Sequence, residues 1–385
     1  MKLTTMNQQT ITRRQLLQNS IAGAGLFLTT QPQLFGQDKK EDGLDWYNVE
    51  DWGIEGKGFT ECERYYDRLP ATAKEEVRGA VWSLSRHSAG MLARFETDAR
   101  NIHVRYDLLS ASLAMPHMPA TGVSGIDLYG RNEEGEDRWV KVTRPGSQHV
   151  EQQLVSGIDA RPNGKPRLYT AYLPLYNGVN KLEFGVPKGT TFKPFAPRKT
   201  KPIVFYGTSI MHGACASRPG MSISALLGRR YDIPTINLGF SGNGRLEPEV
   251  GKYLAELDPA VYCIDCLPNV QAPDVAARTE PLVKQLRKAR PTTPIVLVED
   301  RTYTNAPFFK SSRDRHAASR KALRTAYENL KAAGDKNLYY LEGEIQLGDD
   351  GEGATDGSYP NDLGFVRYAD AYATVLDPLL KPTSH

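Results

Sequence analysis

The sequence predicts an antiparallel β-sandwich followed by a parallel β-sheet covered by helices on both faces. Between about residues 45 and 198 the hydrophobic pattern has a period of two, which is typical of strands. From residue 200 onward, apolar strands alternate with helical stretches. The change falls at 193–200, a stretch rich in Pro and Lys that we interpret as a linker. A chain of 385 residues is longer than one typical core requires, so we expect two domains.

Short strands account for the first domain, 45–198. Apolar and polar residues alternate at 102–106, and two apolar runs at 126–129 and 139–142 flank a polar, Gly-containing loop of hairpin type. Further runs follow at 168–172 and 182–186. Strands this short, broken by Gly, Pro and Asn, favour a sandwich of antiparallel sheets.

Strands and helices alternate through the second domain, 200–381. The strand and helix pairs are 202–206 with 220–230, 235–239 with 247–257, 260–266 with 274–289, and 294–299 with 311–333, before a last strand at 338–341 and a helix from about Asn361. This alternation predicts a parallel sheet, whose ligand site lies at the carboxyl ends of its strands. The polar or glycine residues that follow these strands are Ser209, Gly242, Asn269 and Asp356.

Residues 1–37 are expected to be an export signal. Two adjacent arginines, Arg13 and Arg14, precede a short apolar run rich in Gly and Ala at 20–28, which is typical of a twin-arginine signal. The run is shorter than the roughly 20 residues that span a bilayer, and no later segment is apolar enough. We therefore expect an exported protein, periplasmic or extracellular, with no membrane span in its mature form.

Composition narrows the classes of partner and cofactor. The net charge is only +3 and no basic block is dense, which argues against nucleic-acid binding. Four cysteines are too few for a disulfide framework. Cys263 and Cys266 lie three apart in a predicted strand and so point to opposite faces, which argues against a zinc or redox pair. Cys215 and Cys266 are a candidate disulfide. No cluster predicts a metal site, and no cofactor is expected.

Three segments at predicted strand ends carry candidate catalytic groups. Ser209 follows a strand and Gly207, which allows a tight turn that exposes the hydroxyl near helix-start amides. A simple N-cap serine is the alternative interpretation. The glycine-rich residues 237–244 and the amide of Asn269 are suited to stabilise a developing oxyanion, although a plain loop and an Asn-capped turn are the simpler interpretations.

Together, these segments resemble the SGNH (GDSL-type) hydrolase family. One branch of that family carries an N-terminal Gly-x-Asp-Leu-Tyr motif, matched here at 125–129, and it also carries Gly-Thr-Ser-Ile and Cys-Ala-Ser-Arg-Pro-Gly, matched at 207–210 and 215–220. The resemblance covers about residues 45–380. It implies an α/β fold of three α/β/α layers with a flavodoxin-like parallel sheet, behind the β-sandwich, and it implies ester hydrolysis.

The resemblance also implies the roles of the site residues. Ser209 would be the nucleophile, its amide with Gly242 and Asn269 would form the oxyanion hole, and Asp356 would orient the base. However, Tyr359 stands where the family has its base histidine. A tyrosine hydroxyl has an ordinary pKa near 10, so only about one in a thousand is ionised at neutral pH. Loss of a triad member typically leaves only ~10³–10⁴-fold catalysis over water.

Three other histidines are candidate surrogate bases. His212 lies three residues after Ser209, close in sequence but badly directed. His316 lies on a predicted helix with a charged face. His117 belongs to the first domain and is preferred, because ligand sites commonly form in clefts between domains. For each of the three, a surface or packing histidine is the simpler interpretation.

Two functions follow from these residues. The first is an exported serine esterase that removes a small acyl group such as acetate, with a small-molecule or carbohydrate ester as substrate. The alternative is a catalytically impaired homologue that binds glycans or other ligands, which Tyr359 favours. Arg218 and residues 300–301 also lie near predicted strand ends, where they would either bind substrate oxygens or form structural salt bridges.

Overall fold

Residues 43–380 are described in the computed structural model, and the chain from Leu44 onward forms one compact unit. The expected export signal at 1–37 lies outside the described residues. Within the described range, none of the helices combines the length and the apolar character that crossing a bilayer requires.

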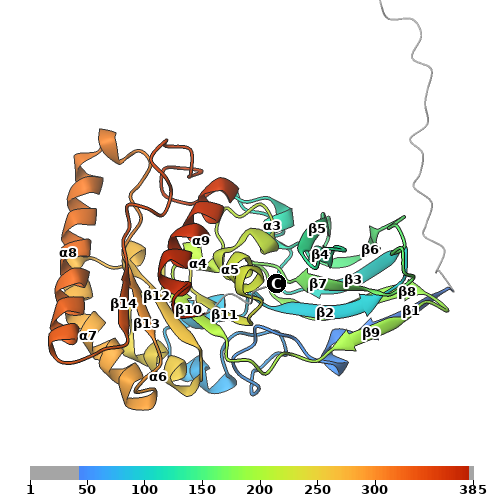
Figure 1. Ribbon diagram of the computed structural model, residues 1–385, viewed down its shortest axis with the longest axis horizontal. Helices are drawn as coiled ribbons and strands as arrows, with labels where there is room; N and C mark the ends of the chain where they lie inside the picture. The colour runs from blue at the N-terminus through green and yellow to red at the C-terminus, as the bar shows by residue number, and fades with distance from the viewer. Residues whose placement is uncertain (1–42, 381–385) are drawn as a thin grey trace, which may run out of the picture. The chain divides into compact units, whose positions relative to one another are not determined.

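Two antiparallel sheets pack face to face in the N-terminal lobe (Figure 1). The first has the order β1 (Leu44–Asn48), β8 (Val179–Pro187), β3 (Ile102–Leu108), β6 (His149–Val155). The second has the order β5 (Asp137–Val142), β4 (Asp127–Arg131), β7 (Arg167–Tyr172), β2 (Leu92–Thr97), β9 (Phe192–Phe195). Phe95 of β2 and Phe184 of β8 meet between the sheets with ring centroids 4.8 Å apart. The predicted β-sandwich is thus confirmed.

The stretch interpreted as a linker at 193–200 begins inside a strand, so that prediction was wrong at its start. β9 pairs with the edge of β2, and Phe192 stacks on Tyr47 at 4.0 Å and on Phe95 at 4.9 Å. Pro194 hides the strand in the sequence, because proline lacks an amide hydrogen and is tolerated only where a strand forms an edge.

The chain between β1 and β2 packs against the second lobe. It contains the short helices η1 (Val49–Asp51), η2 (Ala71–Glu75) and α2 (Gly79–Ser85). Phe59, Val81 and Trp82 join the hydrophobic core of the α/β lobe, and Phe59 meets Tyr253 edge to face at 6.1 Å. Residues 49–91 therefore contribute to the core that the C-terminal sequence builds.

The C-terminal lobe has a five-stranded parallel sheet, as predicted. Its order is β11 (Thr235–Gly239), β10 (Ile203–Gly207), β12 (Val261–Asp265), β13 (Ile295–Val298), β14 (Leu338–Leu341). This is the flavodoxin-like order, in which the first strand lies between the second and the third. The chain therefore reverses its direction across the sheet at β10, which is the point where sheets of this kind bind their ligands.

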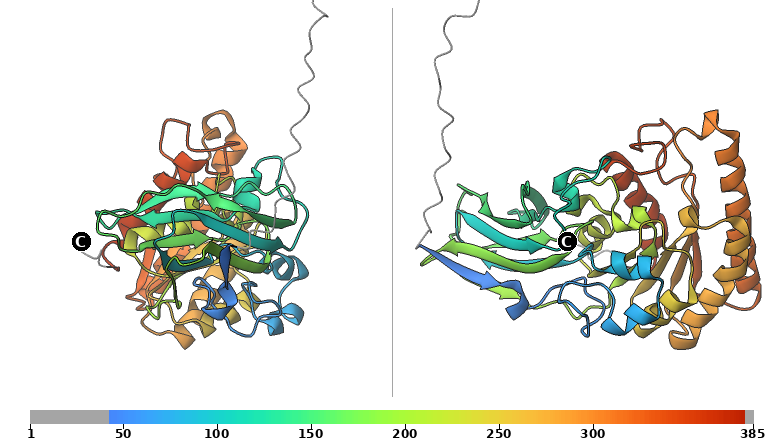
Figure 2. Two further views of the ribbon diagram at one scale, coloured as in Figure 1. Left: turned by 90° about the vertical axis from the view of Figure 1, so that its right-hand side faces the viewer. Right: turned by 180° about the vertical axis from the view of Figure 1, so that it is seen from behind.

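Helices cover both faces of the parallel sheet. In sequence order the connections are α4 (Ser209–His212), η3 (Pro219–Met221), α5 (Ile223–Tyr231), α6 (Pro248–Glu256), η4 (Leu267–Asn269), α7 (Ala272–Ala289), η5 (Ala306–Phe308), α8 (Lys310–Ala332) and α9 (Asp362–Leu376), with α3 (Ala120–Val123) in the first lobe. In Figures 1 and 2, α7 and α8 lie on the side of the sheet away from the antiparallel strands. Helices α5 and α9 pack together on the other face.

Alternating side chains of the parallel strands pack into two separate hydrophobic cores, one on each face of the sheet. Val204 and Tyr206 of β10 join the core beneath α6, α7 and α8, whereas Ile203 and Phe205 join the core beneath α5 and α9. A parallel strand buried on both faces is apolar throughout for this reason. The three α/β/α layers are thus confirmed.

The described cysteines are all free thiols. Cys263 and Cys266 belong to the two different cores, as their spacing in a strand predicts. Cys215 Sγ donates to the carbonyl of His117 at 3.4 Å, and Cys266 Sγ donates to the carbonyl of Tyr206 at 3.7 Å. The candidate disulfide between Cys215 and Cys266 is therefore wrong for this structure, because each thiol is held by a different carbonyl.

The packing of residues 49–91 on the α/β lobe predicts a large cost for truncating Phe59. We expect Phe59→Ala to lower the free energy of unfolding by about 3–5 kcal/mol, because a buried ring is lost and a cavity remains. Phe308→Ala is the matched control, since Phe308 is 84% exposed and its loss should change stability by no more than about 0.5 kcal/mol. Urea unfolding measures both, and equal values would contradict this packing.

Candidate active site

Three chain turns meet where the strand order reverses. In the parallel register, Gly207 at the end of β10 aligns with Gly239 of β11 on one side and with Asp265 of β12 on the other. The amide of Phe240 donates to the carbonyl of Gly207 at 2.9 Å, which ties the turn after β11 to the turn after β10. The residues that follow these strands therefore share one edge of the sheet.

Ser209 is the first residue of α4 and is only 5% exposed. Thr208 caps the helix, because its side-chain oxygen accepts from the amide of Ile210 at 3.3 Å. As the first helical residue, Ser209 has no carbonyl one turn earlier for its own amide to bind. Gly207 is required before it, since a Cβ there would lie 2.8 Å from the carbonyl of Asp265. The turn thus presents a hydroxyl and a free amide together.

Asn269 supplies a donor with nothing to bind. Its side-chain Nδ2 is buried and has no hydrogen-bond partner within the described chain. Gly242, in the turn after β11, has the left-handed φ of 69° that glycine adopts readily. A buried amide left unpaired destabilises the fold by about 1–3 kcal/mol, so a water molecule or a ligand atom is the expected partner. The oxyanion role predicted for Asn269 would give this side chain a partner.

The hydroxyl of Tyr359 faces the hydroxyl of Ser209. Ser209 Oγ donates to Tyr359 Oη over 3.4 Å, whereas an O–H···O bond usually spans about 2.5–3.0 Å. The phenol therefore stands beside the serine where a base would stand, but the contact between them is long and weak.

Asp356 shapes the loop that carries Tyr359. Its Oδ1 accepts from the amide of Ser358 at 2.9 Å and from the amide of Tyr359 at 2.7 Å. Gly357 between them has a φ of 90°, a conformation that favours glycine. No histidine bonds to Asp356 within the described residues, so its carboxylate orients a turn here rather than an imidazole.

Of the three candidate bases, His117 lies beside Tyr359. The two rings are nearly parallel, at 17°, with centroids 5.7 Å apart. His117 is exposed, and it comes from the loop between β3 and α3 of the first lobe. The first lobe therefore brings an imidazole to the residue that contacts Ser209.

His212 and His316 contact other side chains than Ser209 and Tyr359. His212 is fully buried with its Nε2 3.4 Å from Arg68 Nη2 and 3.3 Å from His87 Nδ1, and burial together with Arg68 lowers its pKa well below the ordinary value. His316 packs edge to face on Tyr303 at 4.5 Å, and burial lowers its pKa to about 4. Both are packing histidines and weak bases.

The comparison with known proteins agrees with this geometry. Residues 200–377 match the GDSL-like lipase/acylhydrolase family, and residues 44–192 match the model for the N-terminus of SGNH-hydrolase-type esterases. A GDSL-like lipase from Bacteroides ovatus ATCC 8483 is 31% identical, with 88% of this chain and 98% of that chain covered and a TM-score of 0.83. This chain belongs to the GDSL-like lipase/acylhydrolase family.

More distant structures share the fold. A salicylyl-acyltransferase from a tetracycline biosynthetic pathway is 20% identical over 88% of this chain and 96% of its own, with a TM-score of 0.66. A family two carbohydrate esterase from Cellvibrio japonicus is 12% identical over 88% of this chain and 98% of its own, with a TM-score of 0.57. None of the curated proteins matches the chain.

In this GDSL-like chain, the Gly-x-Asp-Leu-Tyr motif at 125–129 contacts the Cys-Ala-Ser-Arg-Pro-Gly motif at 215–220. Asp127, from the first motif, accepts from the Gly220 amide at 2.8 Å and from Arg218 Nη1 at 3.0 Å through one oxygen, and from Trp139 Nε1 at 2.9 Å through the other. Burial raises the pKa of Asp127, and Arg218 opposes that rise. Arg218 therefore forms a structural salt bridge with Asp127. These contacts hold the loop after α4 against the first lobe.

Two further site residues carry no sequence motif. Tyr176 of the first lobe donates from its hydroxyl to the carbonyl of Ser209 at 3.1 Å. Buried Arg68 donates from Nη1 to the carbonyls of Asn237 at 3.0 Å and Gly239 at 2.8 Å, which holds the end of β11. Both residues lie in loops between strands of the first half of the chain, and no local sequence pattern predicts that they contact the site.

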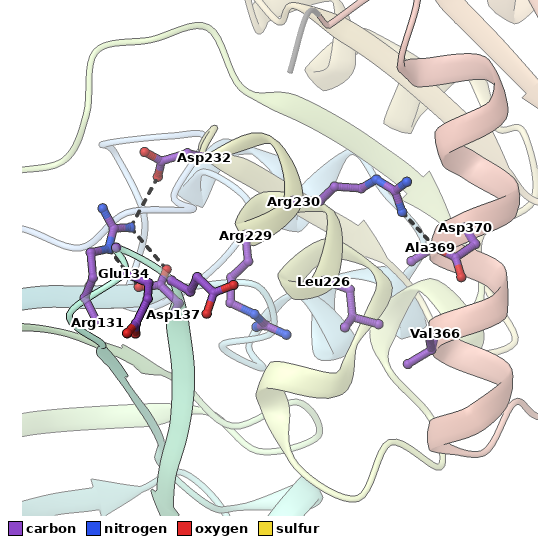
Figure 3. Close-up of a pocket in the computed structure, with 12 residues that line it drawn as sticks. Arg131, Glu134, Asp137, Leu226, Arg229, Arg230, Asp232, Val366, Ala369 and Asp370 are labelled. Carbon is purple, nitrogen blue, oxygen red and sulfur yellow. Dashed lines mark hydrogen bonds and ion pairs between the residues drawn. The ribbon is translucent and has the colours of Figure 1, made fainter. Parts of the chain in front are cut away.

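A hollow of about 540 Å³ lies elsewhere, between the β4–β5 hairpin and helices α5 and α9 (Figure 3). Its charges are largely paired, since Arg131 lies 3.0 Å from Asp137 and 4.0 Å from Asp232, and Arg230 lies 2.7 Å from Asp370. None of the predicted site residues lines it. Neither there nor elsewhere in residues 43–380 do three or more His, Cys, Asp or Glu side chains form a group able to hold a metal ion.

Asp265 is a buried carboxylic acid beneath the site. Its Oδ2 accepts from the hydroxyls of Tyr368 at 2.7 Å and Tyr372 at 2.9 Å, while its Oδ1 is buried with no partner in the described chain. Burial raises the pKa of Asp265 to about 6. The folded protein therefore holds this proton more tightly than the unfolded chain, where an aspartate titrates near ~4.

Stability should consequently fall between about pH 4 and pH 7 because of Asp265. The stabilisation that comes from protonated Asp265 is complete below the pKa that Asp265 has in the unfolded chain. It is lost as the pH rises through the pKa that Asp265 has in the folded protein. In the unaltered protein the free energy of unfolding should fall by up to ~3 kcal/mol over this range, since one pKa unit corresponds to about 1.4 kcal/mol. We expect Asp265→Asn to abolish this fall. Urea unfolding of both proteins across this range measures it. Parallel stability curves would contradict the raised pKa.

Proposed function

We propose that this chain is an exported serine esterase that removes a small acyl group, such as acetyl, from a carbohydrate. The observation that carries the proposal is the placement of Ser209 after β10 and of the unpartnered Asn269 amide after the neighbouring strand β12, where the strand order reverses. Membership of the GDSL-like lipase/acylhydrolase family supports the same class of chemistry.

In the proposed reaction, Ser209 Oγ attacks the acyl carbon of the ester. The carbonyl oxygen becomes an oxyanion, which the amides of Ser209 and Gly242 and the side chain of Asn269 stabilise. As the ester C–O bond breaks, the alcohol leaves with the proton that Ser209 lost, and water then attacks the acyl carbon and releases the acid from the serine. The proposed proton acceptor is His117, beside Tyr359, and no cofactor takes part.

The substrate class rests on the room and the surfaces around Ser209. Because Ser209 is only 5% exposed, we infer that a small acyl group reaches its hydroxyl more readily than a bulky one. The stacked rings of His117 and Tyr359 offer a flat surface against which a sugar ring packs. The fold shared with a family two carbohydrate esterase and the twin-arginine pattern at 1–37 support an exported enzyme that acts on carbohydrate.

A second candidate function is a catalytically impaired homologue that binds a glycan or acylated ligand at the same edge of the sheet. It is favoured by the weak 3.4 Å contact between Ser209 and Tyr359. It is also favoured by the Asp356 carboxylate, which binds amides of its own turn. The two functions differ in their dependence on the hydroxyl of Ser209.

Hydrolysis of p-nitrophenyl acetate separates the two functions. We expect the unaltered protein to exceed Ser209→Ala, and we expect His117→Asn to lower its rate. Tyr359→His should raise kcat by about 10²-fold or more, because a positioned general base contributes ~10²–10⁴-fold. In that variant His117→Asn should no longer matter, since the new imidazole takes over the proton.

His149→Asn is the matched control, because His149 is exposed on β6 and pairs with Asp107. A rate equal to that of Ser209→Ala, with a gain in Tyr359→His, would favour the impaired homologue. Activity that survives Ser209→Ala, or no activity in any variant, would contradict the esterase. An effect of His149→Asn as large as that of His117→Asn would remove His117 as the base.

A further inference from the structure

One buried carboxylate connects the two sides of the candidate site. Asp300 follows β13 and is fully buried. Its Oδ1 lies 2.5 Å from Arg301 Nη1, and its Oδ2 lies 2.6 Å from Arg315 Nη1 of α8. Each carboxylate oxygen therefore binds a different arginine.

Arg301 holds the loop that carries Tyr359. Its Nε donates to the carbonyl of Ser358 at 2.8 Å, and its Nη2 donates to the hydroxyl of the same serine. Tyr359 is the next residue, and its hydroxyl accepts from Ser209. Arg301 is only 1% exposed, so it acts on this loop and is out of reach of a substrate.

Arg315 holds the turn that carries Asn269. Its Nη2 donates to the carbonyl of Pro268 at 2.7 Å and to the carbonyl of Leu267 at 3.3 Å. Asn269 follows directly and presents the unpartnered Nδ2. The backbone before the proposed oxyanion donor is therefore set by the orientation of this guanidinium.

We propose that Asp300 is a positioning residue that sets the distance between Tyr359 and Asn269 on either side of Ser209. The inference rests on the proposed function, because it assigns these residues to one reaction. Hydrogen bonds between ionised groups are short and roughly twice as strong as neutral ones, and the planar guanidinium fixes direction as well as distance. A displacement of about 1 Å in such a site costs up to ~10²-fold in rate.

The neighbouring residue Glu299 provides a matched control. It is also buried at the end of β13, and it accepts from Tyr340 Oη at 2.5 Å and from the amide of Gly343 at 2.9 Å. Its carboxylate also lies 3.4 Å from Arg320 Nε and 3.8 Å from Arg324 Nη2 of α8, and Arg320 donates to the backbone carbonyl of Asp300 at 2.8 Å. None of these partners of the Glu299 carboxylate belongs to the turns that carry Tyr359 and Asn269. Glu299→Gln should therefore destabilise the protein without moving the site.

The first test is kinetic and uses the full mature chain in the Tyr359→His background. We expect Asp300→Asn to lower kcat for p-nitrophenyl acetate by roughly 10- to 100-fold with little change in KM. Glu299→Gln should leave both constants near those of the background. A kcat that falls equally in the two variants would show a general loss of structure and would overturn the proposal.

The second test, hydrogen exchange, needs no catalysis. Asp300→Asn in the otherwise unaltered chain should accelerate amide exchange in both 267–270 and 353–361. Arg315→Lys should accelerate mainly the first segment, and Arg301→Lys mainly the second. If hydrolysis is absent in every variant while this pattern holds, the proposed function fails but the coupling stands. Exchange unchanged in either segment of Asp300→Asn would overturn the coupling itself.

Discussion

The candidate site depends on one constraint, the parallel register that aligns the end of β10 with the ends of both β11 and β12. Hydrogen bonds between these strands bring Ser209, Gly242 and Asn269 to one edge, although the turns are far apart in sequence. Because the strand order reverses at β10, the helices that follow diverge to opposite faces and leave this edge open. The positions of the proposed nucleophile and of its proposed oxyanion donors thus follow from the topology of the sheet.

The N-terminal lobe adds side chains to the site that the parallel sheet does not provide. Asp127 fastens the loop after α4 to the sandwich, and His117 and Tyr176 reach the residues around Ser209. This arrangement explains how a chain with Tyr359 at the base position still offers an imidazole at the site. It also explains the extent of the family resemblance, since the N-terminal motif and the loop after the nucleophile form one contact.

Much of this architecture was predictable from local pattern. Strand ends, the glycine before Ser209 and the amide of Asn269 are marked by neighbouring residues, and the sandwich strands by alternation. Tyr176 and Arg68 were not predictable, because they bind carbonyls 33 and 171 residues away in the chain, and the pattern around each is that of an ordinary loop. The strand β9 was hidden by Pro194, and the proposed disulfide failed because its two thiols bind different carbonyls.

Covalent labelling by a fluorophosphonate shows whether Ser209 is activated, because the reagent requires an activated serine beside oxyanion donors. Intact-protein mass spectrometry and peptide mapping should find one adduct, located on Ser209. The rate of labelling should fall in Asn269→Ala by about 10²–10³-fold, the usual effect of removing one oxyanion donor. An adduct on another residue, or none under conditions that label Tyr359→His, would contradict an active serine esterase.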